Sequence, residues 1–395
     1  MKVAAIITGA DFKTGKGLVN ASLSRVKALE TASNLEVDVF AVTAEWRPFT
    51  FISLFKGSFE HRTVSYEGRD YTLLVKVEYQ SNNRLFRRPL KIFYQKMQYR
   101  NQDWGWHKRF AKYFKGYDLL TSHFNDAAFI AEAANRSYSI PFFVTWHGSD
   151  IHTIPFRDSV AKEKTIAALE HASCNFFVSN ALKQTSDILT DKARKIVAYN
   201  GVDSIFYKFD ESDREHLRNK YGVNGAKVIT FAGNLYPIKN ADLLPAIFQK
   251  IKDTYSGAIQ FWVIGDGELR KSIENSTNKV ALPCRYWGNQ PHKLMPEFFN
   301  CTDVLVLPSK NEGLPLVTLE AISCGANAVG SLVGGIPEAI GLDNCINLQT
   351  PDFVDLFAAR VIDCLNGEVE HNADSCFSWE RSASIEHSEI ERILR

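Results

Sequence analysis

The feature that most restricts the fold of this chain is a recurring alternation, in which short apolar runs are each followed by a segment of helical character. Apolar runs without polar alternation are typical of strands buried on both faces, and alternation with helices favours parallel sheets. The first series of predicted strands is Val3–Ile7, Val37–Val42, Asp118–Thr121, Phe142–Thr145 and Asn175–Val178. The second series is Val228–Ala232, Ile259–Ile264, Val304–Leu307, Ala328–Gly330 and Cys345–Leu348.

The length of 395 residues indicates two domains, because a single hydrophobic core stops growing at roughly 250–300 residues. The predicted fold class is therefore α/β, with two doubly wound, Rossmann-like domains that face a cleft. Residues 1–200 would form the first domain, with an insertion at about 46–115 where the alternation is lost, and residues 201–375 the second. Residues 376–395 have a helical pattern and are predicted to cross back to the first domain.

Charge and cysteine content disfavour several classes of protein. The chain has 46 Lys and Arg against 45 Asp and Glu, which gives no reason to expect a nucleic-acid partner. Its seven cysteines are scattered and form no Cys-x-x-Cys pair, so we expect a reducing compartment and no structural metal. No apolar run reaches ~18 residues and the apolar start is too short for a signal peptide. These observations predict a cytoplasmic protein without a membrane span.

The loop after the predicted strand Val304–Leu307 is the strongest candidate for a ligand site, because ligands of parallel sheets bind beyond the carboxyl ends of strands. Pro315 suits the first position of a short helix, which puts Glu320 in its first turns. Helical side chains lean towards the N-terminus, so the Glu320 carboxylate would lie over free backbone amides. Carboxylates bind sugar hydroxyls, and such amides bind phosphate. The predicted binding residues here are Glu312, Gly313, Leu314, Leu316, Val317 and Glu320.

An ordinary structural explanation exists for both acids, since Glu320 could be a solvated helix residue and Glu312 an acid favoured by a helix dipole. A neighbouring loop argues for a ligand. Lys239 follows the predicted strand Val228–Ala232 beside a helix start, where positive charge is disfavoured unless an anion is near. A further glycine turn, Gly265-Asp266-Gly267, lies between a strand and a helix and could also be only a tight turn.

Two segments of the first half have a similar placement. His147 and Asp150 follow the predicted strand Phe142–Thr145, which would put both on the rim of the cleft. Gly15-Lys16-Gly17 precedes a predicted helix and forms a phosphate-compatible loop. It lacks the Ser or Thr of a Walker loop, and the turn at Gly265 lacks the third glycine of a dinucleotide fingerprint. ATPase and dehydrogenase functions are therefore disfavoured.

Six segments resemble those of the retaining GT-B glycosyltransferases of family 4 in their residues, order and spacing. The resemblance is densest from about residue 178 to residue 340. They are Val178-Ser179-Asn180, Tyr199-Asn200-Gly201-Val202-Asp203, Gly233 to Lys239, Gly265-Asp266-Gly267, the Glu-x7-Glu segment and Gly334-Gly335-Ile336-Pro337-Glu338. The resemblance implies a nucleotide-sugar donor held mainly by the second domain. The implied roles are Lys239 on the diphosphate, Glu312 near the transferred sugar, Glu320 on the ribose, His147 towards the sugar, and Gly15 and Gly17 beside the phosphates.

The function that the resemblance implies is retaining transfer of a sugar from a nucleoside-diphosphate sugar, with a UDP-sugar favoured, to a glycan or lipid-linked acceptor. Bacterial surface polysaccharide synthesis is the setting it suggests. No cofactor or metal is expected, because Lys239 and helix amides can stabilise the leaving diphosphate. The family commonly has arginine where this chain has Asn234, which removes a second cation. The alternatives are a GT-B-like sugar-nucleotide epimerase or phosphorylase and a catalytically silent partner subunit.

The insertion contains many basic and aromatic residues, which suit the anionic inner face of a membrane or a lipid-pyrophosphate acceptor. A solvated amphipathic helix packed on the first domain would explain the same pattern. The basic residues are Arg84, Arg87, Arg88, Lys91, Lys96, Arg100, Lys108, Arg109, Lys112 and Lys115. The aromatic residues are Phe86, Phe93, Tyr94, Tyr99, Trp104, Trp106 and Phe110.

Overall fold

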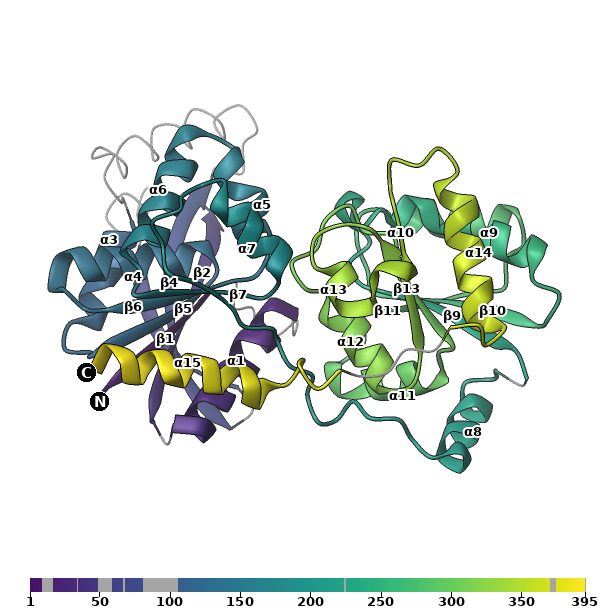
Figure 1. The fold of residues 1–395 in the computed structure, drawn as a ribbon, viewed down its shortest axis with the longest axis horizontal. Helices are drawn as coiled ribbons and strands as arrows, with labels where there is room; N and C mark the ends of the chain where they lie inside the picture. Colours follow the sequence, from purple (N-terminus) through teal and green to yellow (C-terminus); the bar gives the residue numbers. More distant parts are fainter. Residues whose placement is uncertain are drawn as a thin grey trace. The chain divides into compact units, whose positions relative to one another are not determined.

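A computed structural model describes residues 1–8, 17–33, 35–48, 59–66, 68–80, 106–223, 225–369 and 374–394 of the chain. These residues form two compact units, each built around its own sheet (Figure 1). The first unit comprises Met1–Val178, Leu182–Ala198 and Ser382–Arg395, and the second comprises Ser179–Ala181 and Tyr199–Arg381. The predicted α/β class with two parallel-sheet domains is confirmed.

The sheet of the first unit has the strand order β3-β4-β2-β1-β5-β6-β7-β8. Its neighbouring strands are parallel except for β3 and β4, which form an antiparallel hairpin at one edge. The strands are β1 (Val3–Thr8), β2 (Val37–Pro48), β3 (Phe59–Tyr66), β4 (Arg69–Gln80), β5 (Leu119–His123), β6 (Phe142–Trp146), β7 (Cys174–Phe177) and β8 (Lys195–Val197).

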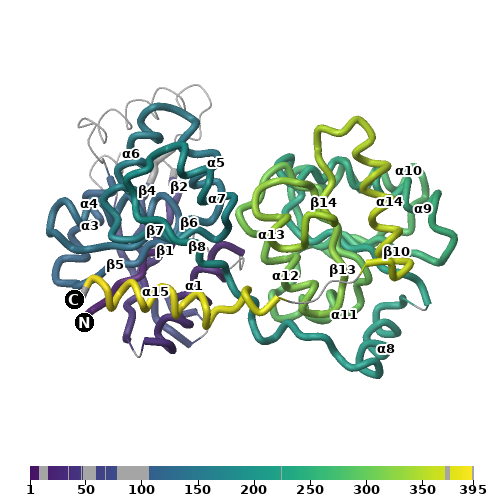
Figure 2. Tube along the Cα trace, in the orientation of Figure 1, coloured from purple at the N-terminus to yellow at the C-terminus, as the bar shows by residue number. Residues whose placement is uncertain are grey.

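Helices cover both faces of this sheet (Figures 1 and 2). On one face, Val26 of α1 and Ile390 of α15 share an apolar core with Val3, Ala5 and Ile7 of β1. On the other face lie α4 and α6, which contact each other. The α-helices of the unit are α1 (Gly17–Ser33), α3 (His107–Ala111), α4 (Asn125–Tyr138), α5 (Ser149–His152), α6 (Ser159–His171), α7 (Asn180–Asp187) and α15 (Trp379–Leu394).

The second unit has a wholly parallel sheet of order β11-β10-β9-β12-β13-β14. On one face, α9 and α14 pack together, and Phe248 of α9 stacks on Phe261 of β10 with ring centroids 4.3 Å apart. The strands are β9 (Lys227–Ala232), β10 (Ile259–Ile264), β11 (Cys284–Gly288), β12 (Val304–Leu307), β13 (Asn327–Ser331) and β14 (Cys345–Ile346). The α-helices are α8 (Glu211–Lys220), α9 (Leu244–Thr254), α10 (Arg270–Lys279), α11 (Met295–Cys301), α12 (Leu316–Ser323), α13 (Ile336–Ile340) and α14 (Phe353–Leu365).

Part of the region predicted as an insertion belongs to the first sheet, which differs from the prediction. The strand β2 continues to Pro48, and β3 and β4 extend the sheet beyond it. Residues 81–105, which hold most of the basic and aromatic cluster, lie outside the described residues. Within the described part, Phe110 is buried and packs edge-on against Phe59, with centroids 5.5 Å apart. This aromatic residue therefore serves the core of the unit.

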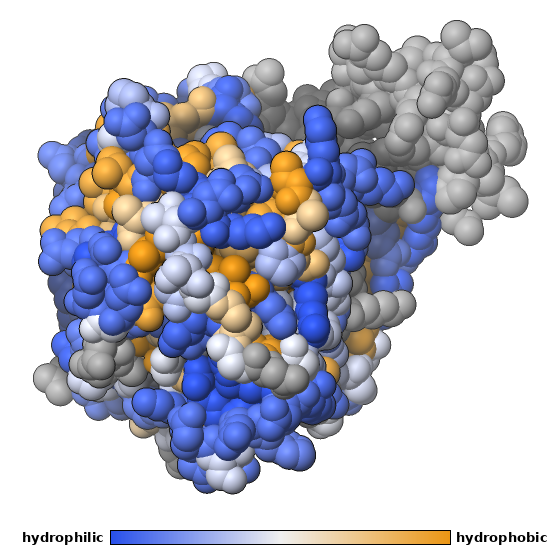
Figure 3. All heavy atoms as spheres, turned by 90° about the vertical axis from the view of Figure 1, so that its right-hand side faces the viewer, coloured by the Kyte–Doolittle hydropathy of each residue, from blue (hydrophilic) through white to orange (hydrophobic). Residues whose placement is uncertain are grey.

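The surface of the second unit gives no sign of a broad apolar band on the face that Figure 3 displays, where hydrophobic and hydrophilic side chains are interspersed. Exposed apolar residues scattered in this way are normal for a folded domain. None of the helices in the described ranges combines the length and the apolar character needed to cross a bilayer.

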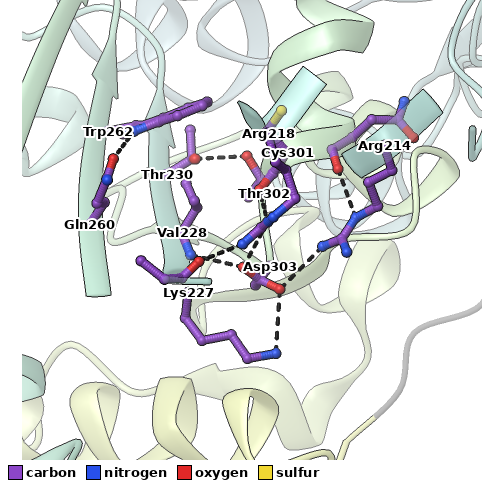
Figure 4. A network of polar contacts seen from close by, with 12 residues as sticks. Arg214, Arg218, Lys227, Val228, Thr230, Gln260, Trp262, Cys301, Thr302 and Asp303 are labelled. Atoms are coloured by element: carbon purple, nitrogen blue, oxygen red, sulfur yellow. Dashed lines mark hydrogen bonds and ion pairs between the residues drawn. The ribbon is translucent and has the colours of Figure 1, made fainter. Parts of the chain in front are cut away.

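A network of charges fastens α8 to the amino end of the second sheet (Figure 4). Asp303, which precedes β12, accepts hydrogen bonds from Arg214 at 3.2 Å and Arg218 at 3.3 Å. Its carboxylate also accepts the backbone N–H of Val228 in β9 at 2.8 Å. The Asp303 side chain is only 12% exposed, so its charge depends on these partners.

We expect Asp303→Ala to destabilise the second unit by about 3 kcal/mol, because it leaves two arginines of a largely buried network without their shared carboxylate. Chemical unfolding followed by tryptophan fluorescence would measure the loss, since Trp262 lies in this sheet. Asp363→Ala is the matched control. Its carboxylate is 38% exposed and pairs with Arg360 one turn away, so the change should stay within about 0.5 kcal/mol. Equal effects of the two substitutions would contradict the role given to Asp303.

Candidate functional site

Four loops leave the carboxyl edge of the second sheet next to one another, because they follow β10, β9, β12 and β13, which are neighbours in the sheet. Backbone hydrogen bonds join these loops. Lys310 N donates to Ile238 O at 2.9 Å, and Gly335 N donates to Glu312 O at 3.2 Å. The loop that carries Glu312 is therefore held from both sides.

Two glycines of the predicted motifs are needed for this close packing. Gly334 has φ +50°, and a Cβ at this position would lie 1.9 Å from Glu312 O. Gly265 has φ +124°, and a Cβ there would lie 2.0 Å from Gly233 O. Any side chain would force the loops apart, so these glycines set the position of the backbone around Glu312 and after β9.

An ion pair between Lys239 and Glu312 lies at this edge. Lys239 Nζ is 2.6 Å from Glu312 Oε1, and Ser309 Oγ donates to the same oxygen at 2.7 Å. The two charged side chains are 24% and 11% exposed. Lys239 ends the 3-10 helix Pro237–Lys239, whereas Glu312 lies in the loop before α12. The structure thus supplies a carboxylate partner for Lys239 that the sequence argument did not foresee.

Glu320 lies in α12 with its side chain 15% exposed, and its Oε1 is 3.3 Å from His292 Nε2. His292 was not predicted; its ring also meets Phe206 edge-on at a centroid distance of 5.1 Å. The helix α12 begins at Leu316, so Pro315 precedes the helix rather than occupying its first position. The amides of Leu316 and Val317 are therefore the first of the helix and have no partner within it.

The remaining predicted donor residues have varied surroundings. Gly313 and Leu314 are buried, and Asn234 is exposed in the loop after β9. Gly17 is the first residue of α1, and a Cβ there would meet no described atom within 4 Å. Gly15 lies outside the described residues.

Asp150 was predicted to lie on the rim of a cleft. Its side chain is wholly buried within the first unit. Its Oδ2 accepts the N–H of His147 at 2.9 Å, and its Oδ1 accepts the N–H of Gly148 at 2.6 Å. Burial raises the pKa of Asp150 to about 6, although these backbone hydrogen bonds oppose the shift. The carboxylate thus fixes the turn that carries His147.

A second histidine, which the sequence analysis missed, contacts His147. His123 is the last residue of β5, next to β6, and is 1% exposed. Its Nδ1 is 3.3 Å from His147 Nε2, and the two rings stack with centroids 5.5 Å apart. Its position just after the predicted strand Asp118–Thr121 was the signal, because polar residues at the carboxyl ends of adjacent parallel strands lie close together.

Both histidines are held neutral at neutral pH. Burial, together with the charge of Arg25, lowers the pKa of His147 to about 3. Burial, His147 and Arg25 also lower the pKa of His123 well below its ordinary value. Arg25 is itself buried and pairs with Glu386 of α15, with Nε 3.0 Å from Oε2. The positive charge that disfavours protonation is thus fixed inside the first unit.

The lowered pKa values of these histidines predict that the stability of the first unit depends on pH. An imidazole in the unfolded chain has a pKa near 6.5, whereas the folded values are lower. Below about pH 6.5 the unfolded state therefore binds more protons, and the free energy of unfolding falls by up to about 1.4 kcal/mol per pH unit and group. Urea unfolding at pH 7 and pH 5 would measure this loss for the first unit.

The variant His147→Gln isolates the contribution of one imidazole. It should lose less stability between pH 7 and pH 5 than the parent chain, because only His123 then resists protonation. Asp150 acts in the opposite direction below about pH 6 in both chains, since its pKa is raised, and so cancels in the comparison. An unchanged pH dependence would contradict the lowered pKa of His147.

A known family matches most of the second unit. Residues 213–375 match the sequence model described as glycosyl transferases group 1. This part of the chain is similar to that family. It contains Lys239, Glu312 and Glu320, the charged residues that the structure places at the carboxyl edge of the second sheet. Among the described residues, no group of three His, Cys, Asp or Glu side chains could hold a metal ion.

Curated relatives extend the comparison beyond this segment. The chain is 30% identical over 232 residues to an uncharacterized glycosyltransferase of Methanocaldococcus jannaschii, with 57% of this chain and 59% of the relative covered. It is 26% identical over 299 residues to the D-inositol 3-phosphate glycosyltransferase of Geodermatophilus obscurus, with 67% and 64% covered. The chain thus spans about three fifths of the length of these relatives.

The similarity of fold covers the whole chain. The Anabaena protein HepE, solved in complex with UDP, has a TM-score of 0.68 with this chain at 17% identity, with 100% of this chain and 99% of HepE covered. At this identity the comparison establishes the arrangement of strands and helices.

Proposed function

We propose that this protein is a retaining glycosyltransferase that moves a sugar from a UDP-sugar to a glycan or lipid-linked acceptor. The observation that carries the proposal is the Lys239–Glu312 pair, with Nζ and Oε1 2.6 Å apart, on the same sheet edge as Glu320 and the start of α12. This set lies within the residues that match the family. The related fold of HepE has been solved with UDP-glucose, which supports a uridine nucleotide as the donor.

The charges suit the departure of a nucleoside diphosphate. As the bond between the sugar carbon and the phosphate oxygen breaks, the sugar gains positive character and the diphosphate gains negative charge. Lys239 would stabilise the diphosphate, and the amides of Leu316 and Val317 would donate hydrogen bonds to it. Glu312 would face the sugar side, where its carboxylate favours the developing positive charge. Glu320 would accept hydrogen bonds from the ribose hydroxyls.

Retention would follow from attack on the face that the diphosphate leaves. The acceptor oxygen forms its bond to the sugar carbon on that face, and its proton passes to the departing phosphate oxygen. No side chain is then required as a base. The buried Asp150 fits this scheme, because its carboxylate is engaged with the amides of His147 and Gly148. In the proposed enzyme His147 would contact the donor sugar as a neutral ring.

The proposed setting is the cytoplasmic face of a bacterial membrane, in the synthesis of a surface polysaccharide. It rests on the basic and aromatic residues between Arg84 and Lys115, which would attract anionic lipid headgroups. Cosedimentation with phosphatidylglycerol vesicles at low and high salt tests this contact. Retention of the protein in the supernatant at low salt would remove the membrane from the proposal.

A panel of nucleotide sugars tests the donor. We expect calorimetry to show binding of UDP and of one UDP-sugar, and mass spectrometry to show a glycosylated product only with an acceptor. The anomeric coupling constant of the product reports retention or inversion. Consumption of the nucleotide sugar without an acceptor would instead identify an epimerase, and consumption that depends on inorganic phosphate a phosphorylase. Absence of all nucleotide binding would identify a silent subunit.

A further inference from the structure

Two neutral imidazole rings in hydrogen-bond contact constrain each other. Each neutral ring carries one proton on one of its two nitrogens. In the contact between His123 Nδ1 and His147 Nε2, at 3.3 Å, one nitrogen must donate and the other accept. If His123 donates from Nδ1, His147 must carry its own proton on Nδ1. If His147 donates from Nε2, His123 must carry its proton on Nε2. The two rings therefore share one tautomeric form.

The surroundings of His123 fix its ring more firmly than that of His147. His123 is 1% exposed and belongs to β5, which pairs with β1 on one side and β6 on the other. Its backbone carbonyl accepts a hydrogen bond from Thr8 Oγ1 at 3.3 Å. His147 instead lies in the turn after β6 and is only partly buried. The ring in the strand is thus the fixed partner, and the ring in the turn is the one it can orient.

We propose that His123 is a positioning residue for His147, and that its Nδ1 contact fixes both the orientation of the His147 ring and the nitrogen on which His147 carries its proton. His123 lies outside the residues that match the family. The proposal rests on the proposed function only in that His147 faces the donor sugar during transfer.

A fixed and neutral His147 suits the proposed reaction. Positive character develops on the sugar as the diphosphate leaves, so an imidazolium beside it would raise the barrier. Burial and the positive charge of Arg25 disfavour that imidazolium. Arg25 of α1 is itself buried and paired with Glu386 of α15, while Asp150 of α5 holds the backbone amide of His147. Fixing the proton position would also present the same hydrogen-bonding atom to every donor molecule.

The state of the ring can be observed directly in the free protein. Long-range ¹H–¹⁵N correlation spectra of protein labelled on histidine nitrogens distinguish the two neutral tautomers and the imidazolium. The chain has ten histidines, and the loss of signals in His123→Asn and His147→Gln would assign the pair. We expect His147 to show one neutral tautomer without averaging from pH 5 to pH 8. Averaged nitrogen shifts in the parent protein would overturn the proposal without any further variant.

Two substitutions at His123 separate hydrogen bonding from packing. His123→Phe keeps a ring of similar size but removes both nitrogens, so His147 should show averaged tautomers while staying neutral, because burial and Arg25 still lower its pKa. His123→Asn places an amide near the position of Nδ1 and should restore a single form. Ser122→Ala is the matched control, because it removes a buried hydrogen bond to Phe143 O from the same strand and should leave the His147 spectrum unchanged.

Transfer kinetics then connect the ring to the reaction. His123→Phe should lower the transfer rate on the order of tenfold, as expected for one lost hydrogen bond, with a similar loss at pH 5.5 and at pH 8. His123→Asn should recover most of the rate. An unchanged His147 spectrum in His123→Phe would overturn the positioning role. An altered spectrum with an unchanged transfer rate would keep that role and instead remove His147 from the proposed reaction.

Discussion

Lys239→Met should reduce sugar transfer by roughly one hundred- to one thousandfold at saturating donor, the cost of removing one preorganised group that stabilises a leaving anion. It should also weaken the binding of UDP, because the diphosphate is already charged before the reaction begins. Methionine keeps most of the aliphatic length of lysine and removes only the cation. Single-turnover transfer and calorimetry with UDP would measure the two losses separately.

The nearby Lys310 provides a matched control for Lys239. It is an exposed lysine in the loop after β12, and its backbone N–H already bonds to Ile238 O. Lys310→Met should change transfer and UDP affinity by less than about threefold, as for an exposed charge in high dielectric. Equal effects of the two substitutions would mean that only the overall charge of this edge matters. Unchanged UDP affinity in Lys239→Met would show that Lys239 does not bind the diphosphate.

Glu312→Gln should separate binding from reaction, with slower transfer but UDP binding that is as strong as before or stronger. The reason is the direct pair of Lys239 Nζ and Glu312 Oε1 at 2.6 Å. Glutamine removes a negative charge next to the predicted diphosphate position and releases Lys239 to interact with phosphate alone. Transfer should nevertheless fall by about ten- to a hundredfold, since a carboxylate no longer opposes the positive character of the sugar.

Glu320→Gln is the comparison for Glu312→Gln, because it changes an acid of the same motif that is predicted to bind the ribose. We expect it to weaken UDP and UDP-sugar binding together, with a smaller effect on single-turnover transfer at saturating donor. Circular dichroism and thermal unfolding would verify that each variant is folded. If Glu312→Gln lost UDP affinity and kept its transfer rate, the assignment of Glu312 to the sugar side would be wrong.

The alternation of apolar runs was enough to predict the class of fold, and it placed β10 and β12 at their observed bounds. It failed towards the edges of the first sheet. In β3, the residues of the edge strand are all partly buried or exposed, and β8 has only three residues. Short or half-exposed strands lack the continuous apolar run that the prediction relied on. The partner strand β4 is buried from Leu73 to Val77 and was assigned to the insertion all the same.

The candidate site could be predicted from the sequence only in part, for a different reason. Parallel topology brings the ends of β9 and β12 to one edge, which is why Lys239 and Glu312 could be assigned to the same region. Their direct contact joins residues 73 positions apart and depends on side-chain directions that no spacing rule provides. The contacts of Asp150 were likewise not predictable from its position after a strand. The turn at Gly148 instead directs its carboxylate inward to backbone amides.

The helix α15 has a consequence for biosynthesis. Arg25 in α1 finds its carboxylate partner, Glu386, only after 361 further residues of the chain, and Ile390 of the same helix completes the apolar core beside β1. Domains usually fold in order as they leave the ribosome. Here Arg25 of the first unit lacks the Glu386 carboxylate until the second unit has been translated. A nascent chain arrested before residue 382 should therefore depend on chaperones, even though nearly all of its first sheet has already been made.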